Sequence, residues 1–582
     1  MSGTFFNWQA SKLAKYLFYW PTTKMKKVLP MPISSRLIPY PLMLFTCILF
    51  VIQTSCAQPL NKKEEYSNQD SLRGSITRER AWWDVVSYDI AITPDFTNRS
   101  IEGKNDIQFK VTAPGDVMQI DLQHPMDITK VTWRGKGLSM TRNGNVYHIT
   151  FPSAMKPGSI EKVTIEYKGK PRIANNPPWD GGWIFTKDKL GRPWMSVACQ
   201  GLGASVWYPC KDHQSDEPDS ASISIEVPDT LVAVANGQLA EQKSYRPGMT
   251  TYKWTVRNPI NNYNIIPYIG KYINWTETYQ GEKGPLACSY WVLDYNESKA
   301  RKQFSQGIQT LKALEYWFGP YPFYEDGYKL VESPHLGMEH QSAVAYGNGY
   351  INGYKGQDLS GTGWGLKWDY IIVHESGHEW FGNNITTKDI ADMWVHEGFT
   401  DYSETLFTEY YYGKEAGATY IQGLRKNILN DKPIIGKYGI NQEGSGDMYY
   451  KGANLVHTIR QIINDDNQFR SILRGLNKEF YHQTVTTKQV ENYINKQSGK
   501  DFSKTFDQYL RTTQVPTLEL KIDDSSLKYK WSHCISGFNM PVKLSNGLWL
   551  YPTTEWRKLK TEEELTKGLS ADKNFYISVK RL

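Results

Sequence analysis

The pattern of hydrophobic and polar positions first indicates a β-rich region. Between residues 80 and 285, apolar side chains alternate with polar ones in short runs, as at Tyr88, Ile90 and Ile92, and Gly, Pro and Asn separate the runs. Alternation with a period of two is typical of strands that are buried on one face. The pattern predicts a β-rich domain over residues 78–285.

The periodicity changes near residue 290. Phe304, Ile308 and Leu311 recur every three or four positions, and a Gly-Pro pair at 319–320 ends the run. This spacing is typical of an amphipathic helix, and Gly followed by Pro is a helix stop signal. Helical patterns continue downstream, so the sequence predicts a mostly helical domain over residues 286–515.

The last part of the chain, residues 516–582, returns to alternation. Apolar positions alternate on both sides of the polar stretch 523–526 and again on both sides of Asn546-Gly547. Asn-Gly between alternating runs is a strong hairpin signal. We expect two hairpins and a short C-terminal β-sandwich-like tail. The predicted fold class is therefore α+β and multidomain.

The N-terminal segment, residues 1–57, has the features of an export signal. Basic residues precede an apolar run of 12 at residues 41–52, and small residues allow cleavage after Ala57. Twelve apolar residues are too few for an ordinary membrane-spanning helix, which needs about 20, but suit a signal peptide. A start at Met25 gives a signal of more usual length.

Two alternatives to cleavage stay open for this segment. One is lipid attachment at Cys56, and the other is a retained signal that anchors the chain in a membrane. Residues 58–77 are polar and charged, which predicts a flexible tether. The expected location is extracytoplasmic: periplasmic, secreted or attached to the cell envelope.

The charge balance excludes one class of protein. The formal net charge is +7, but six basic residues and no acidic ones lie before residue 58, so the remaining chain is close to neutral. Without a basic body, phosphate contacts cannot hold a nucleic acid, and we predict no nucleic-acid partner. An exported chain can form disulfides, and three pairings stay open for the four cysteines after the signal: Cys199, Cys210, Cys288 and Cys534.

The stretch His374-Glu375-Ser-Gly-His378 carries the clearest chemical signal. Side chains four residues apart on a helix project from one face, so His374 and His378 can share a metal ion. Glu375 lies beside the first histidine and can reach a water at the metal. Glu397 follows His378 by nineteen residues, and a second helix running back past the first would bring its carboxylate to the histidines. Two imidazoles and one carboxylate with an open fourth position form a catalytic Zn²⁺ site, one per chain.

This stretch resembles the zinc aminopeptidases of the aminopeptidase N and leukotriene hydrolase family. The family pattern is His-Glu-x-x-His followed after eighteen residues by Glu, and Trp380-Phe-Gly-Asn383 and Glu397-Gly-Phe399 match it as well. The resemblance implies a saddle-like β-rich N-terminal domain. It also implies a thermolysin-like, mostly helical catalytic domain.

A second segment supports the resemblance. Gly337-Met338-Glu339 is similar to the family's Gly-x-Met-Glu-Asn segment, so Gly337, Met338 and Glu339 are expected to contact substrate. By this match, Glu339 binds the α-ammonium group of a peptide. Leu336 and His340 depart from the family pattern, which affects the first specificity pocket.

Three further residues receive roles from the resemblance. Tyr449-Tyr450-Lys-Gly resembles the family's Tyr-x-Lys-Gly, which assigns Tyr449 to the transition state, with its neighbour Tyr450 as the competitor. Gln200 lies in a loop similar to the one that reaches the family's active site, and would help Glu339. Glu404, two turns after Glu397, matches a carboxylate that orients a ligand histidine.

The predicted function is zinc-dependent removal of the N-terminal residue from peptides with a free N-terminus, as in peptide catabolism. Glu375 is the expected general base and Tyr449 the expected donor to the oxyanion. The alternatives are an epoxide hydrolase, a non-catalytic peptide-binding protein on the same scaffold, and an envelope glycan binder suggested by the 14% aromatic content.

Overall fold

The computed structural model describes residues 66–523, 526–560 and 569–582. The predicted export signal, with Met25 and Cys56, lies outside the described residues. Part of the predicted tether lies inside them and is a helix, α2 (Asn68–Gly74). Its Arg73 forms an ion pair with Asp212 at 3.2 Å. The tether prediction is therefore wrong from residue 68 onward, because a polar helix can be held to a domain by charge.

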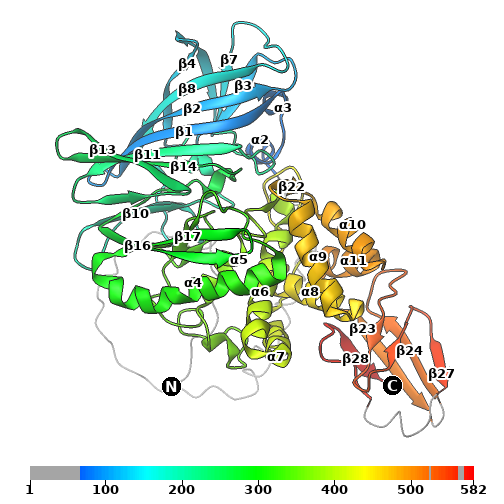
Figure 1. The fold of residues 1–582 in the computed structure, drawn as a ribbon. Coiled ribbons are helices and arrows are strands. Elements are labelled where there is room, and N and C mark those ends of the chain that lie inside the picture. The colour runs from blue at the N-terminus through cyan, green and yellow to red at the C-terminus, as the bar shows by residue number, and fades with distance from the viewer. Residues whose placement is uncertain (1–65, 524–525, 561–568) are drawn as a thin grey trace, which may run out of the picture. The chain divides into compact units, whose positions relative to one another are not determined.

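The N-terminal domain is built on an eight-stranded sheet in the order β13-β14-β11-β1-β2-β8-β4-β5 (Figure 1). The central strand β1 pairs antiparallel with β2, which places Ile90 opposite Asn105, and parallel with β11. Smaller sheets β12-β15-β10-β9 and β3-β7-β6 complete the domain. The strands are β1 (Trp83–Asp95), β2 (Ser100–Val111), β3 (Val117–Asp121), β4 (Asp127–Trp133), β5 (Lys136–Gly137), β6 (Ser139–Asn143), β7 (Val146–Thr150), β8 (Ile160–Gly169), β9 (Gly182–Lys187), β10 (Pro193–Ala198), β11 (Ser220–Pro228), β12 (Val232–Val234), β13 (Gln238–Arg246), β14 (Met249–Val256) and β15 (Tyr268–Gly270).

The predicted boundary at 285 lies too late in the chain. The hairpin of β16 (Tyr272–Gly281) and β17 (Gly284–Leu293) pairs through β17 with β18 (Tyr328–Glu332), which continues to β20 (Val344–Tyr346) and β19 (Gly337–Met338). The hairpin therefore belongs to the sheet of the next domain. Alternation along a strand does not reveal which sheet the strand joins, so the pattern alone could not separate them.

Helices follow this sheet. Helix α4 (Glu297–Phe318) confirms the predicted amphipathic helix, and it ends where Gly319 adopts a φ of 96°. Figure 1 shows α4 along the β16–β17 hairpin, and α4 also contacts α5, α6 and α9 among the remaining helices. These are α5 (Tyr370–Gly377), α6 (Trp394–Tyr412), α7 (Lys414–Leu424), α8 (Tyr450–Ile463), α9 (Asp466–Glu479), α10 (Thr487–Ser498) and α11 (Ser503–Arg511).

The C-terminal tail confirms both predicted hairpins. One joins β23 (Thr517–Asp523) and β24 (Ser526–Ser532), and the other joins β25 (Val542–Lys543) and β26 (Trp549–Leu550). The first hairpin lies in a sheet of order β27-β24-β23-β28, with β27 (Arg557–Lys560) and β28 (Ser578–Arg581) at its edges. Apolar residues of the tail share one core with the helical domain. The α+β multidomain fold class is confirmed.

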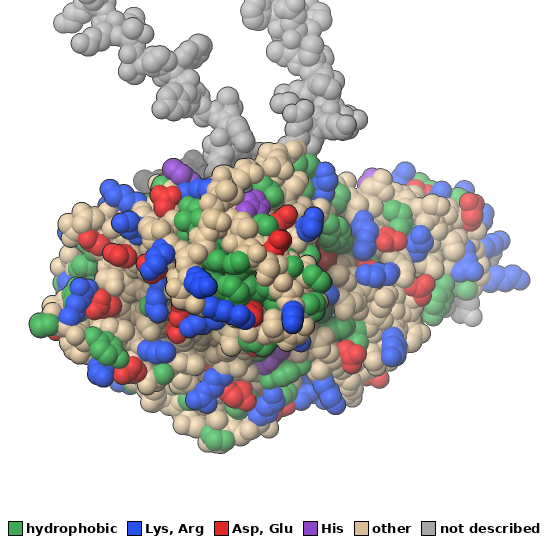
Figure 2. All heavy atoms as spheres, turned by 90° about the horizontal axis from the view of Figure 1, so that it is seen from above, with side chains coloured by type: hydrophobic (Ala, Val, Ile, Leu, Met, Phe, Trp, Pro, Cys, Tyr) green, Lys and Arg blue, Asp and Glu red, His purple; other side chains and the backbone are tan. Residues whose placement is uncertain are grey.

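Two further properties hold for the described residues. Their four cysteines are free thiols, three of them buried. Within the same residues, no helix is both long and apolar enough to cross a bilayer. Acidic and basic side chains are interspersed on the face shown in Figure 2.

Helices α6 and α8 touch backbone to backbone. A Cβ atom added to Gly398 of α6 would lie 3.1 Å from the Met448 carbonyl oxygen and 3.2 Å from the Cα of Gly452 in α8. Gly398 belongs to the segment Glu397-Gly-Phe399 and Gly452 to Tyr449-Tyr450-Lys-Gly, and the sequence predicts active-site residues in both segments. Their missing side chains let the first residue before α8, Tyr449, lie close to Glu397 of α6.

We expect Gly398→Ala to lower the free energy of unfolding by about 1–3 kcal/mol, because the new methyl group overpacks a backbone contact. Gly307→Ala in α4 is the matched control. Its methyl group would meet only side-chain atoms, the nearest at 3.3 Å, and Ala is about 1 kcal/mol better than Gly in a helix. Denaturant unfolding of both variants measures the difference. Equal stability of the two variants would contradict the close crossing.

Candidate active site

Helix α5 is fixed at its N-terminus by Asp369. The carboxylate accepts hydrogen bonds from the backbone N–H groups of Ile371 and Ile372, at 3.1 and 3.4 Å. It also accepts one from Gln303 of α4 at 2.6 Å and one from Tyr346 of β20 at 2.8 Å. A capping carboxylate satisfies the free N–H groups of a first helical turn. Here it also ties α5 to the neighbouring helix and sheet.

Helix α5 carries His374 and Glu375, and His378 follows at its C-terminal cap. The two imidazole rings are nearly perpendicular, with centroids 5.0 Å apart. Both Nε2 atoms face Oε2 of Glu397 in α6, at 3.8 Å from His374 and 3.4 Å from His378. The structure therefore brings together the three residues whose spacing predicted a metal site.

In both imidazole rings, hydrogen bonds determine which nitrogen carries the proton. Nδ1 of His378 lies 2.9 Å from the Phe381 carbonyl oxygen, which can only accept, so Nδ1 donates. Nδ1 of His374 lies 2.7 Å from Oε1 of Glu404, and Tyr420 donates to the other oxygen of Glu404 at 2.6 Å. With Nδ1 donating in each ring, the unprotonated Nε2 atoms face Glu397. Glu404 lies where the resemblance placed it.

These residues fit one zinc ion. Oε2 of Glu397 is buried and has no hydrogen-bond partner, and its distances to the imidazoles are too long for good hydrogen bonds. A buried charged oxygen without a partner is costly, so the site needs a cation. Two imidazole nitrogens and a carboxylate oxygen that lie within 4.8 Å of one another form a donor set that zinc prefers.

Glu375 lies beside this site and against a glycine. A Cβ atom on Gly337 of β19 would lie 2.8 Å from Oε1 of Glu375 and 2.8 Å from a methyl carbon of Ile371. Only glycine lets β19 approach α5 so closely. Met338 is 8% exposed and packs at the edge of the N-terminal core. Burial raises the pKa of the Glu375 carboxyl to about 7.

The carboxylate of Glu339 receives two donors from the N-terminal domain. Gln200 donates from Nε2 to Oε1 of Glu339 at 2.5 Å, and the Tyr263 hydroxyl donates to the same oxygen at 3.0 Å. Sequence reasoning identified Gln200 and missed Tyr263. The available signal was the polar run Asn261-Asn262-Tyr263-Asn264 inside a region of alternating strands.

His340, which departs from the family pattern, points into the core. The Tyr268 hydroxyl donates to the Ala343 carbonyl at 2.8 Å, and it accepts from Nδ1 of His340 at 2.5 Å. The ring is fully buried. The departure therefore changes packing behind Glu339.

Of the two neighbouring tyrosines, Tyr449 lies at the site. Its ring stacks on His374, with centroids 6.2 Å apart. Burial and the carboxylates of Glu397 and Glu443 hold its pKa well above the usual range, so the phenol is a hydrogen-bond donor. Burial and the carboxylates of Asp401 and Glu404 hold the pKa of Tyr450 well above the usual range, and Glu404 bonds Nδ1 of His374. This placement favours Tyr449 over Tyr450.

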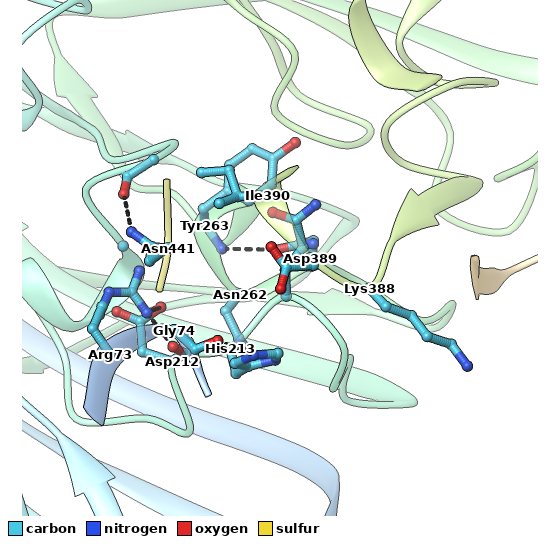
Figure 3. Close-up of a pocket in the computed structure, with 14 residues that line it drawn as sticks. Arg73, Gly74, Asp212, His213, Asn262, Tyr263, Lys388, Asp389, Ile390 and Asn441 are labelled. Atoms are coloured by element: carbon cyan, nitrogen blue, oxygen red, sulfur yellow. Dashed lines mark hydrogen bonds and ion pairs between the residues drawn. The ribbon is translucent and has the colours of Figure 1, made fainter. Parts of the chain in front are cut away.

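A pocket adjoins the Glu339 site (Figure 3). Tyr263 lines it, and so does Gly201, the residue after Gln200. Figure 3 shows the Tyr263 ring pointing away from the Arg73–Asp212 ion pair at the opposite side. The other lining residues come from α2 and from loops of both domains: Gly74, Gly203, His213, Gln214, Asn261, Asn262, Lys388, Asp389, Ile390 and Asn441.

Comparison with known families agrees with this geometry. Residues 85–263 match the Peptidase M1 N-terminal domain and residues 303–509 match the Peptidase family M1 domain, together more than half of the chain. The chain belongs to the M1 peptidase family.

Known proteins similar to this M1 family chain include enzymes from several organisms. Endoplasmic reticulum aminopeptidase 1 of Mus musculus is 20% identical over 72% of the chain, and leukotriene A-4 hydrolase of Xenopus laevis is 22% identical over 69%. Aminopeptidase B of Mus musculus is 24% identical over 60%. The chain covers 46%, 66% and 54% of the lengths of these three relatives.

A solved structure shows the same fold. The M1 zinc metallopeptidase of Deinococcus radiodurans superposes with a TM-score of 0.61 at 21% identity, covering 74% of this chain and 95% of that one. In another structure from this organism, a mutant M1 zinc metallopeptidase is bound to a Tyr-Ser-Ala substrate.

We expect the purified protein to hold about one zinc per chain and His378→Ala to lose it, because a ligand is removed. Glu404→Ala should weaken zinc binding about 10- to 100-fold, since it loosens the orientation of His374. The matched control is His457→Ala, a buried histidine of α8 that bonds Tyr402 instead. Elemental analysis and competition with a chelator measure both effects. Full zinc content in His378→Ala would contradict the site.

Proposed function

We propose that this chain is a zinc-dependent aminopeptidase that removes the N-terminal residue from peptides. The observation that carries the proposal is the distance between an amine-binding carboxylate and the catalytic groups. Oxygen atoms of Glu339 and Glu375 and a ring nitrogen of His378 lie within 4.8 Å of one another. Consecutive Cα atoms are about 3.8 Å apart, so an ammonium at Glu339 leaves room for one residue before the reacting bond.

Residues of this chain have separate roles in the proposed reaction. Glu339, held by Gln200, binds the ammonium and rejects internal peptide segments, which carry no charge there. Glu375 takes a proton from water and returns it to the leaving amine. Tyr449 donates a hydrogen bond to the oxygen on which negative charge develops, which for such donors contributes about 3 kcal/mol. When bound, zinc acts as a Lewis acid that polarises the scissile carbonyl and makes water more acidic.

The comparisons support this function over the alternatives. Two of the relatives named above are called aminopeptidases. The complete set of His374, Glu375, His378 and Glu397 argues against a protein that has lost catalysis. No feature of the described residues favours epoxide hydrolysis or glycan binding, and we do not propose them.

Export is the second part of the proposal. The basic and apolar segments before Ala57 support an extracytoplasmic enzyme, either released after cleavage or attached through a lipid at Cys56 or a retained signal. The N-terminal sequence and mass of the mature protein, isolated from its native host, decide among these forms.

Glu375→Gln should keep zinc and the folded structure but lose at least about 100-fold in kcat, because an amide cannot take a proton from water at neutral pH. Turnover of an aminoacyl amide, zinc content and melting temperature are measured on the same preparation. A variant that retains more than about a tenth of the wild-type rate would show that another group is the base.

Acetylation of the substrate's N-terminus should abolish cleavage, because Glu339 then meets no positive charge. Glu339→Gln should lower kcat/KM for free-amine substrates by about 100-fold, which corresponds to losing one buried charge-assisted contact of about 3 kcal/mol. Asp389→Asn is the matched control: it removes a negative charge from the adjacent pocket and none from the amine site. Cleavage of a blocked peptide at an equal rate would identify an endopeptidase.

A further inference from the structure

The short turn η4 (Asn262–Asn264) of the N-terminal domain holds Glu339 from two directions. Tyr263 donates from its hydroxyl to Oε1 of the carboxylate at 3.0 Å. Asn264 donates to Oδ1 of Asn383 at 2.7 Å, and Asn383 donates to the backbone oxygen of Glu339 at 2.8 Å. One turn therefore contacts both the side chain and, through one amide, the main chain of Glu339.

The turn itself is rigid. Asn261 caps it by accepting from the N–H of Tyr263. The Tyr208 hydroxyl donates to the Asn262 carbonyl at 3.0 Å, and the side chain of Asn262 donates to the Lys211 carbonyl at 2.7 Å. All three residues of the turn are buried. A donor carried by such a turn cannot follow a carboxylate that rotates, so it fixes the rotation of that carboxylate.

Two side-chain donors from the N-terminal domain reach the same oxygen of Glu339. Gln200 and Tyr263 both donate to Oε1. A carboxylate oxygen offers about two lone-pair positions, so these donors fill Oε1. The negative charge that can still accept a new donor is then concentrated on Oε2. Burial and the nearby Glu339 carboxylate hold the pKa of Tyr263 well above its usual range, so the phenol keeps its proton.

We propose that Tyr263 is a positioning residue that fixes the Glu339 carboxylate so that Oε2 meets the substrate's α-ammonium group. The inference rests on the proposed aminopeptidase function, because it concerns how the amine is recognised. Tyr263 acts through Glu339 and touches no reacting atom. It makes selectivity for a free amine a property of the contact between the two domains.

The test is Tyr263→Phe, which removes the hydroxyl and keeps the ring. Tyr272→Phe is the matched control, because it also removes a buried tyrosine hydroxyl. That hydroxyl donates to the backbone oxygen of Glu332 and does not contact Glu339. We expect Tyr263→Phe to raise KM for an aminoacyl amide about tenfold, since a hydrogen bond to a charged group is lost. We expect kcat to stay within about twofold, because the base and the zinc ligands are untouched.

A pair of inhibitors separates positioning from general damage. Leucinamide carries the α-amine, and 4-methylpentanamide is the same molecule without it. We expect Tyr263→Phe to weaken the binding of leucinamide about tenfold and to leave the binding of 4-methylpentanamide unchanged. We expect Tyr272→Phe to change the binding of neither inhibitor. When Glu339→Gln is already present, adding Tyr263→Phe should change leucinamide binding little, because the two residues act as a unit.

Three results would overturn the inference: equal weakening of both inhibitors, unchanged binding of both, or the same effect in Tyr272→Phe. If Tyr263→Phe does not fold, Asn264→Ala tests the turn through its second connection and should show the same selectivity for the amine-bearing inhibitor. Calorimetric binding of leucinamide needs no turnover. An inactive wild-type enzyme would therefore refute the proposed function. If the wild-type enzyme is active but Tyr263→Phe does not selectively weaken leucinamide binding, only the role of Tyr263 is refuted.

Discussion

Helix α6 can hold a carboxylate between two histidines because its neighbours approach it at backbone distance. On one side, a Cβ atom on Gly377 of α5 would lie 2.6 Å from Oγ of Ser403. On the other side, Gly398 meets Gly452 of α8 with no side chain between them. A side chain at any of these glycines would push neighbouring atoms away and disturb the spacing of the helices, whereas metal–ligand bonds of about 2 Å tolerate little displacement. The geometry of the site therefore depends on close helix packing.

Burial then gives the site its chemical character. His374, His378 and Glu397 are each 5% exposed or less, so their charges are poorly screened and their hydrogen bonds are strong. Each ring donates from Nδ1 to an oxygen and turns Nε2 toward Glu397. A cation at this position satisfies the carboxylate oxygen that the fold leaves without a partner. Protein packing thus directs the three donors toward one point.

The second feature of the site lies between the domains. Glu339 comes from the catalytic domain, but Gln200 and Tyr263, which bond its carboxylate, come from the β-rich domain. The pocket behind Tyr263 is lined by both domains as well. In the proposed reaction, the helical domain carries the catalytic groups and the β-rich domain orients the group that selects the substrate's end. Substitutions at the contact between the two domains should therefore reduce the selectivity for a free amine more than they reduce kcat.

The sequence by itself determined what depends on local spacing. Histidines four residues apart on a helix must share a face, so His374 and His378 could be paired without a structure, and the helix stop at Gly319 and both C-terminal hairpins followed from short-range rules. Only the tertiary structure decided what depends on contacts between distant segments. The β16–β17 hairpin has the same alternation whichever sheet it joins. Helix α2 is polar and forms an ion pair with Asp212, and Tyr263 meets Glu339 across 76 positions of the chain. No local pattern encodes such a contact, because burial and the packing of two domains create it.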